Sequence, residues 1–171
     1  MENQNISFLA PSLFQQHWST TEVLGSIIWI WMHSPHHQQY TIQTFRQHVI
    51  PAVNCHQFAI FYSDQQPIAY FTWAMFDEHA EQAYIHNNRS LLKHPQNWNC
   101  GTRMWLIDWF SPFGHTLYLK KIIKNQLFPT SVSRYLYHRG HQKQVKIMLA
   151  KGAAISPEEF AYWIENNPIN I

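Results

Sequence analysis

The sequence predicts a single α/β (α+β) domain in which helices flank a mixed central sheet. Helical patterns precede a central set of strand patterns, and a strand-glycine-helix unit lies in the middle of the chain. Apolar residues make up 46% of the 171 residues and charged residues only 13%, so the chain can bury a hydrophobic core. We expect one domain over 19–171, preceded by an N-terminal arm, 1–18, without sustained periodicity.

Two helices are expected before the first strand. The segment STTE (19–22) has the form of a capping box, and apolar residues follow it at helical spacing. This helix should end before Pro35, because the residue before a proline is displaced from the α region. Thr41 can cap a second helix that ends near Pro51.

The central strands follow directly. QFAIFYS (57–63) and IAYFTWAMF (68–76) are aromatic and β-branched, and the turn-like segment between them predicts a hairpin. Residues 77–92 have a weak helical pattern. A further strand is expected in RMWLIDWFSPFGH, where Pro112 and Gly114 end it.

The last part of the chain completes the alternation of helices and strands. Apolar residues and lysines alternate over 117–127 as in an amphipathic helix that closes at Pro129. Strands are expected at 131–137 and 144–149. SPEE (156–159) is a second capping box with proline at the first helical position, which predicts a helix over 157–166.

Positive charge is concentrated in residues 101–151. This segment contains nine lysines and arginines and a single acidic residue, Asp108, so its net charge is +8, whereas the net charge of the whole chain is +2. Such a segment is either a solvated basic face or a docking surface for an acidic protein, nucleic acid or anionic membrane. No basic-aromatic motif matches a known nucleic-acid module, so we expect no nucleic-acid partner.

The cysteines and the hydrophobic stretches point to an intracellular protein. Cys55 and Cys100 have neither disulfide-framework nor zinc spacing. The N-terminal segment lacks the basic and apolar regions of a secretory signal, and the stretch IIWIWM is too short to span a bilayer. A cytoplasmic location without a transmembrane segment is therefore expected.

Histidines cluster in MHSPHHQQY (32–40). His33 and His37 have the i, i+4 spacing of two zinc ligands, but Pro35 interrupts the helix and the glutamate of a HExxH motif is missing. A metal site is therefore disfavoured. A nucleophilic Cys-His pair has no signature either, because neither cysteine lies in a recognisable context.

Asp108 is the one carboxylate in an otherwise apolar predicted strand. A charge in such a place needs a defined partner, because its desolvation is costly. The partner could be structural, either backbone amides or an arginine such as Arg103. The functional alternative is that Asp108 holds and polarises an imidazole.

Four segments together carry a resemblance to a known family. EVLGSIIWIWMHSPHH, VIPAV, QQPIAYFTWA and RMWLIDWFSPFG occur in this order. At these separations they resemble the bacterial lysine acyltransferases that activate RTX protoxins. The likeness is specific from about Glu22 to Gly114 and looser to about residue 165. It implies a fold similar to the GNAT acetyltransferases. It also implies transfer of a fatty acyl chain from acyl carrier protein to internal lysines of a protoxin.

The resemblance also implies the site residues. His37 ends the family's Ser-Pro-x-His motif, Asp108 lies in its Ile-Asp-Trp motif, and Ser34, which opens the first motif, is carried over less firmly. This sequence departs from the usual pattern in its first 20 or so residues, in His36 and in His115.

The expected donor is an acyl carrier protein with its phosphopantetheine thioester, and we expect no tightly bound cofactor or metal. FSPFGHTLYL holds one glycine, whereas acetyl-CoA-dependent GNAT enzymes use a glycine-rich loop to bind pyrophosphate at this place. An acidic carrier would dock on basic side chains, for which we name Lys120, Lys121, Lys124, Arg134 and Arg139.

The chemistry explains why a histidine is needed. A free lysine amine has a pKa of about 10.4, so a base must remove its proton before it attacks a thioester at neutral pH. Direct transfer assisted by His37 is preferred, and an acyl-His37 intermediate stays open. The alternative functions are a non-catalytic module that binds carrier protein or membrane, and a metal-dependent hydrolase. A homodimer and a peripheral membrane contact also stay open.

Overall fold

The computed structural model describes residues 5–35, 37–86, 89–138 and 145–169. The helices are α1 (Thr20–Met32), α2 (Ile42–His48), α3 (Ile50–Asn54), α4 (Glu78–Ile85), the short η1 (Arg89–Lys93) and η2 (Pro95–Asn97), α5 (Thr116–Ile122), its π-helical continuation η3 (Ile123–Leu127) and α6 (Pro157–Asn166). The strands are β1 (Ile6–Leu9), β2 (Phe58–Ser63), β3 (Gln66–Phe76), β4 (Arg103–Phe110), β5 (Val132–His138) and β6 (Val145–Lys151).

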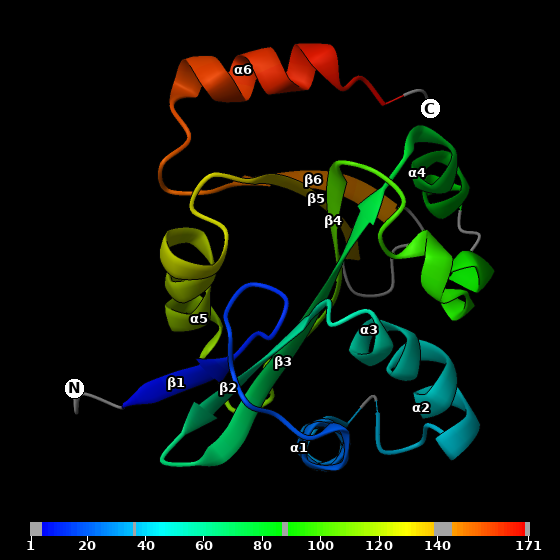
Figure 1. The fold of residues 1–171 in the computed structure, drawn as a ribbon, viewed down its shortest axis with the longest axis vertical. Coiled ribbons are helices and arrows are strands. Elements are labelled where there is room, and N and C mark those ends of the chain that lie inside the picture. The colour runs from blue at the N-terminus through cyan, green and yellow to red at the C-terminus, as the bar shows by residue number, and fades with distance from the viewer. Residues whose placement is uncertain (1–4, 36, 87–88, 139–144, 170–171) are drawn as a thin grey trace.

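The strands form one mixed sheet in the order β1-β2-β3-β4-β5-β6. All neighbours pair antiparallel except β4 and β5, which are parallel. Figure 1 shows α5 on one side of the sheet, α1, α2 and α3 on the other, and α6 across β5 and β6. This arrangement confirms the predicted single domain with a mixed sheet flanked by helices, and it is consistent with a GNAT-like fold.

Strand alternation divides the core between the two faces. Phe58 and Ile60 of β2 pack with α1, α2 and α3, whereas Ala59 and Phe61 pack with α5 and η3. Successive side chains of a strand point to opposite faces, so this long apolar run is buried on both sides. The helices on the two faces can therefore present different groups to the same strands.

The first residues of the chain differ from the expected arm. Residues 6–9 form β1, an edge strand that pairs with β2, and Ala10 is fully buried. The Gln16 side chain accepts a hydrogen bond from the Ala10 N–H at 2.7 Å and donates one to the Phe8 carbonyl at 2.9 Å. The segment carries too few residues for a visible period, and it is ordered by contacts with residues far along the chain.

Two of the three expected helix caps are formed. Thr41 accepts a hydrogen bond from the Thr44 N–H, and Ser156 and Glu159 form the complete capping box of α6. Ser19 occupies the N-cap position of α1 but makes no side-chain capping hydrogen bond, so this capping box is corrected. The second helix also differs, because it is split into α2 and α3 and passes Pro51.

A buried carboxylate joins the parallel strands β4 and β5 to α4. Glu81 is fully buried and accepts hydrogen bonds from Arg103 of β4 at 2.5 Å, from the indole of Trp105 at 2.8 Å, and from Arg134 of β5. A second Arg134 nitrogen donates to the Asn167 carbonyl beyond α6. Arg134 was expected on a carrier-binding surface, but only 2% of its side chain is exposed, because Glu81 draws the guanidinium into the core.

Replacing Glu81 with alanine should destabilise the fold by about 3–5 kcal/mol, because it leaves two guanidinium groups without their carboxylate. Urea unfolding would measure this loss. The matched control is Glu78→Ala on the same helix, where a 65% exposed carboxylate lies 3.7 Å from Arg103. This exposed pair should contribute about 0–1 kcal/mol. Equal stability of the two variants would contradict the structural role of Glu81.

Candidate active site

His37 lies in a tight turn that follows α1. The Ser34 N–H donates to the Trp31 carbonyl at 3.0 Å, and the His37 N–H donates to the Ser34 carbonyl at 2.9 Å. The helix ends at Met32, before Pro35, as the sequence predicted, and Pro35 lies within the turn that follows. His36 lies outside the described residues. These backbone hydrogen bonds therefore fix the turn from which the His37 side chain extends.

The His37 ring is held by a hydroxyl and by aromatic rings. Ser34 Oγ lies 2.6 Å from His37 Nδ1, a hydrogen-bonding distance. The ring meets Phe110 of β4 edge to face, with 4.0 Å between centroids, and it packs against Trp31 and Tyr40 at 4.9 and 5.0 Å. These contacts orient a half-buried imidazole and bring Ser34 and His37 together.

A β-bulge in β4 determines which face Asp108 occupies. Thr72 pairs with Asp108 and Trp73 with Leu106, so Ile107 is an extra residue without a partner in β3. Before the bulge, Leu106 packs towards α5, whereas after it Phe110 packs in the cluster with α1. A bulge shifts the alternation of a strand and redirects its side chains. Asp108 and Phe110 therefore share the face on which His37 lies.

The surroundings of Asp108 are largely apolar. Its backbone N–H donates to Thr72 Oγ1 at 3.2 Å. Burial raises the pKa of the Asp108 carboxyl, and the positive charges of His48 and Arg89 partly oppose this effect. Arg103, the arginine proposed as a structural partner, instead contacts Glu81 and Glu78. His48 and Arg89 were missed, because nothing in their sequence positions links them to Asp108.

Two buried tyrosines share this region with Asp108. Desolvation raises the pKa of Tyr70 well above its ordinary value, and the Asp108 carboxylate adds to the effect. The pKa of Tyr84 is raised to about 12, mainly by desolvation, with Arg89 lowering it and Asp108 raising it. Tyr70 also stacks on Phe110, with 5.7 Å between ring centroids. Both phenols therefore stay neutral at physiological pH.

The parallel strands β4 and β5 separate beyond a short paired segment. Their register covers only Met104–Leu106 and Ser133–Tyr135, although β4 continues to Phe110 and β5 to His138. A cavity of about 630 Å³ lies at this wedge, and its walls include Asp108, Trp109, Tyr135, Tyr137, Lys120 and Lys124. Asp108 thus lies on the same face of the sheet as His37 and also lines the cavity.

Three of the five basic residues named for carrier binding are exposed, and two of them, Lys120 and Lys124, line this cavity. Lys120 and Lys121 lie on α5 and Lys124 on η3, and all three are exposed. Arg134 is buried against Glu81, and Arg139 lies outside the described residues. The exposed basic surface is therefore the lysine face of α5 and η3.

The other histidine of the motif is held differently. His33 Nδ1 lies 2.8 Å from the Trp29 carbonyl, and its ring packs against Phe113 at 5.0 Å. Within the part of the chain that the structure describes, no three His, Cys, Asp or Glu side chains gather as a metal site would require. Both cysteines are free thiols. Among the same residues, no helix has the length and apolar character needed to cross a membrane.

Comparisons with known proteins agree with this architecture. Residues 16–151 match the family described as the RTX toxin acyltransferase family. The RTX-II toxin-activating lysine-acyltransferase ApxIIC of Actinobacillus pleuropneumoniae is 36% identical over 135 residues, which cover 78% of this chain and 82% of that protein. The leukotoxin-activating lysine-acyltransferase LktC serotype A11 of Mannheimia haemolytica is 36% identical over 134 residues, 78% of each chain. The protein-lysine myristoyltransferase HlyC of Escherichia coli is 33% identical over 111 residues, which cover 63% of this chain and 64% of that protein.

Proposed function

The chain belongs to the RTX toxin acyltransferase family, and from this premise we propose that it transfers a fatty acyl group from acyl carrier protein to internal lysines of an RTX protoxin. The observation that carries the proposal is the placement of His37 and Asp108. The bulge at Ile107 turns Asp108 onto the face where Phe110 contacts the His37 ring, at the edge of the cavity between β4 and β5.

In this mechanism His37 is the general base. The lysine nitrogen attacks the thioester carbonyl, the new N–C bond forms, and the C–S bond to phosphopantetheine breaks. The lysine ammonium first loses one proton to water. Because Ser34 engages Nδ1, we assign to Nε2 of His37 the second proton, which the attacking nitrogen loses as the N–C bond forms. The proton then passes to the departing thiolate, which leaves as a thiol. The same imidazole serves in both steps and ends the cycle neutral.

Asp108 and Ser34 are positioning residues in this scheme. The Asp108 carboxylate stabilises the imidazolium formed when His37 takes the proton, and its effect is strengthened because the carboxyl group is partly desolvated. Ser34 holds the ring at hydrogen-bonding distance from its hydroxyl. The scheme requires no metal ion.

The wedge between β4 and β5 suits the arm of a carrier protein. The thioester end of phosphopantetheine is uncharged and can lie among Trp109, Tyr135 and Tyr137. Lys120 and Lys124 line the same cavity and can meet the acidic carrier outside it. A carrier-protein donor also implies that the reaction takes place in the bacterial cytoplasm.

The direct test is incubation of the purified protein with myristoyl-acyl carrier protein and a candidate RTX protoxin. Mass spectrometry of the protoxin peptides should find the mass of the acyl group on a lysine. Carrier binding without transfer would support the non-catalytic module instead. Transfer that a chelator abolishes and added metal restores would favour a metal-dependent reaction and contradict the scheme.

Reversing the charges of Lys120, Lys121 and Lys124 together should raise the KM for the carrier by about tenfold or more, with a much smaller change in kcat. These exposed side chains meet the donor and not the reacting atoms. Raising the salt should weaken the wild-type enzyme's apparent affinity for the carrier, since the screening length is about 8 Å at physiological salt.

The control carries the same change in net charge elsewhere on the surface. Arg46, Lys93 and Lys146 are exposed and lie on other elements, so Arg46→Glu, Lys93→Glu and Lys146→Glu together should leave the KM near the wild-type value. Equal effects of the two triple variants would mean that net charge, and not the lysine face, attracts the carrier. Efficient use of free acyl-CoA would contradict a dedicated carrier surface.

A further inference from the structure

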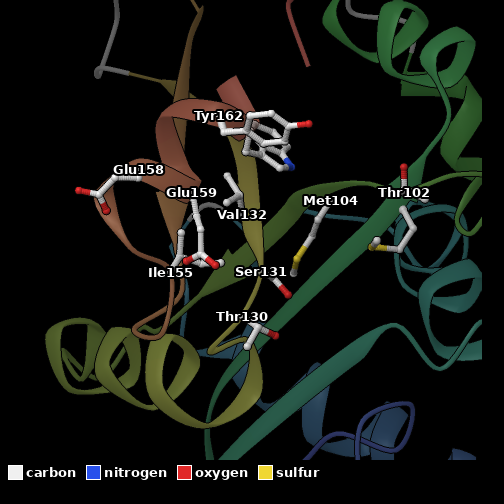
Figure 2. A pocket seen from close by; sticks show the side chains of 11 residues that line it. Thr102, Met104, Thr130, Ser131, Val132, Ile155, Glu158, Glu159 and Tyr162 are labelled. Carbon is white, nitrogen blue, oxygen red and sulfur yellow. The ribbon is translucent and has the colours of Figure 1, made fainter. Parts of the chain in front are cut away.

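A second cavity lies beneath α6, at the end of the sheet where β4 and β5 begin. Its volume is about 610 Å³. Tyr162 and Trp163 of α6 line one side, and Met75, Met104 and Val132 line it from the strands. Figure 2 shows Tyr162 above Val132, with Thr130 and Ser131 on the opposite side of the cavity from the tyrosine.

Helix α6 is tied down at both ends and leaves this space below it. At its C-terminal end, Arg134 stacks 4.7 Å from the Trp163 ring centroid and donates to the Asn167 carbonyl. At its N-terminal end, Lys151 donates to the Ile155 carbonyl at 2.9 Å. No residue of α6 is fully buried, although the helix is amphipathic. The helix is thus held at both ends and covers one side of the cavity.

The two cavities share walls. Met104 and Ser131 line both the cavity beneath α6 and the cavity between β4 and β5. Methionine has three rotatable bonds and adapts its shape readily. A change of rotamer of Met104 can therefore connect the two cavities that its side chain separates. The path along β4 from Trp109 to Met104 is about 17 Å, at about 3.3 Å per residue. One lipid tail extends about 15 Å, half of a hydrocarbon layer of about 30 Å, so the end of a long chain that begins at Trp109 comes close to the Met104 side chain.

The chemistry of the cavity beneath α6 suits a neutral, apolar group. Methionine, valine, isoleucine and tryptophan side chains line it, and the polar groups among them include the hydroxyls of Thr130 and Ser131. The charged side chains in its lining are Glu158 and Glu159, which would repel a phosphate or a carboxylate. A hydrocarbon end fits this lining, whereas the phosphate of the carrier's arm does not.

We infer that the methyl end of a long donor acyl chain reaches Met104, the wall shared by the two cavities, and meets the cavity beneath α6 there, so that this cavity sets the longest chain the enzyme accepts. The inference rests on the proposed acyl transfer. It adds a specificity site remote from His37 and built from α6, Thr130 and the start of β4. A chain too short to reach Met104 would not contact this site.

The first test narrows the cavity. Thr130 is an exposed lining residue beside Ser131, and Thr130→Trp should fill the space that the chain end would occupy. In this variant, the ratio of kcat/KM for palmitoyl-carrier to kcat/KM for octanoyl-carrier should fall by about tenfold or more relative to the wild type. Each methylene kept out of the cavity lowers the ratio about fourfold, from roughly 0.8 kcal/mol per buried CH₂. Thr102→Trp, from another exposed lining position, should act in the same direction.

The matched control is Thr21→Trp, the same replacement at an exposed position in the first turn of α1. Its chain-length profile should equal that of the wild type. An unchanged profile in both cavity variants, with transfer intact, would overturn the inference while leaving the proposed function in place. Loss of transfer in the wild-type protein would instead overturn the proposed function.

A second test does not depend on activity. Wild-type protein is irradiated with palmitoyl-acyl carrier protein whose acyl chain ends in a diazirine, and the labelled peptides are mapped by mass spectrometry. The label is expected on residues around Met104 and on 155–163, which include the first seven residues of α6. Label confined to α1 and α2 would place the chain on the opposite side of the sheet and overturn the inference.

Discussion

His37→Ala should lower acyl transfer to the protoxin on the order of 10³-fold or more, because the variant lacks the group that takes the lysine proton. The free energy of unfolding should change by about 1–2 kcal/mol at most, since the half-buried ring is in a turn and not in the core clusters. Single-turnover transfer, followed by mass spectrometry, measures the first effect, and urea unfolding measures the second.

The neighbouring histidines are the controls for this variant. His33→Ala should keep near-normal turnover, because His33 packs on Phe113 and bonds the Trp29 carbonyl. His36→Ala should also cost far less than His37→Ala. An inactive His36 variant beside a normal His37 variant would mean that the motif is aligned wrongly by one residue. Acyl label trapped on His37 during turnover would replace direct transfer with a two-step route.

The rate should also depend on pH in a direction set by the base. Imidazole accepts a proton only when neutral, and its ordinary pKa is about 6.5. The value of kcat/KM should therefore fall as the pH is lowered through the histidine pKa. A rate independent of pH in that range would argue against a histidine base.

Asp108→Asn should lower kcat on the order of 10² to 10⁴-fold, because the amide keeps the shape of the side chain but loses the charge that favours the imidazolium. In a serine protease, the same change at the aspartate that orients the histidine lowers kcat by about 10⁴-fold. Undiminished turnover would show that the carboxylate is structural, and the role of Asp108 in catalysis would be withdrawn.

The same variant should be more stable than the wild type at neutral pH. Desolvation raises the pKa of Asp108 in the folded protein, so the fold is favoured when the group is protonated and loses stability as the pH rises through the raised pKa. Asparagine carries no charge and avoids this loss. The difference in Tm should shrink as the pH falls from the raised pKa to about 3.9, the ordinary carboxyl pKa, and should stay constant below it. Asp64→Asn, in the exposed hairpin turn, is the control and should show no such trend.

Local signals predicted the elements that local interactions build. The hairpin of β2 and β3 turns at Asp64 and Gln65, which both have positive φ, where the sequence placed a turn. The capping box of α6 forms because its two partners are three residues apart. β1 was missed because a four-residue edge strand gains its order from β2, some 50 positions along the chain.

In the candidate site, too, local sequence signals identified some features, and contacts between distant segments determined the others. The motifs shared with the family pointed to His37 and Asp108. The bulge that turns Asp108 towards the face on which His37 lies depends on the register of β4 with β3. That register cannot be read from β4 alone. Arg134 looks like any exposed cation in the sequence, and only the fold brings it to Glu81, which lies on another element. The assignments of His37, Asp108 and Ser34 to catalysis stay predictions until the variants are measured.

The short pairing of β4 with β5 has a consequence for how the fold holds together. Strands β1 to β4 form one antiparallel group, and β5 and β6 form a second. In the sheet the two groups meet only along Met104–Leu106 and Ser133–Tyr135. This seam joins segments distant in the chain, so it closes late and opens early compared with the hairpins. In the proposed function, a donor arm bound in the wedge would touch both groups, so its binding would stabilise the folded domain against states in which this seam has opened.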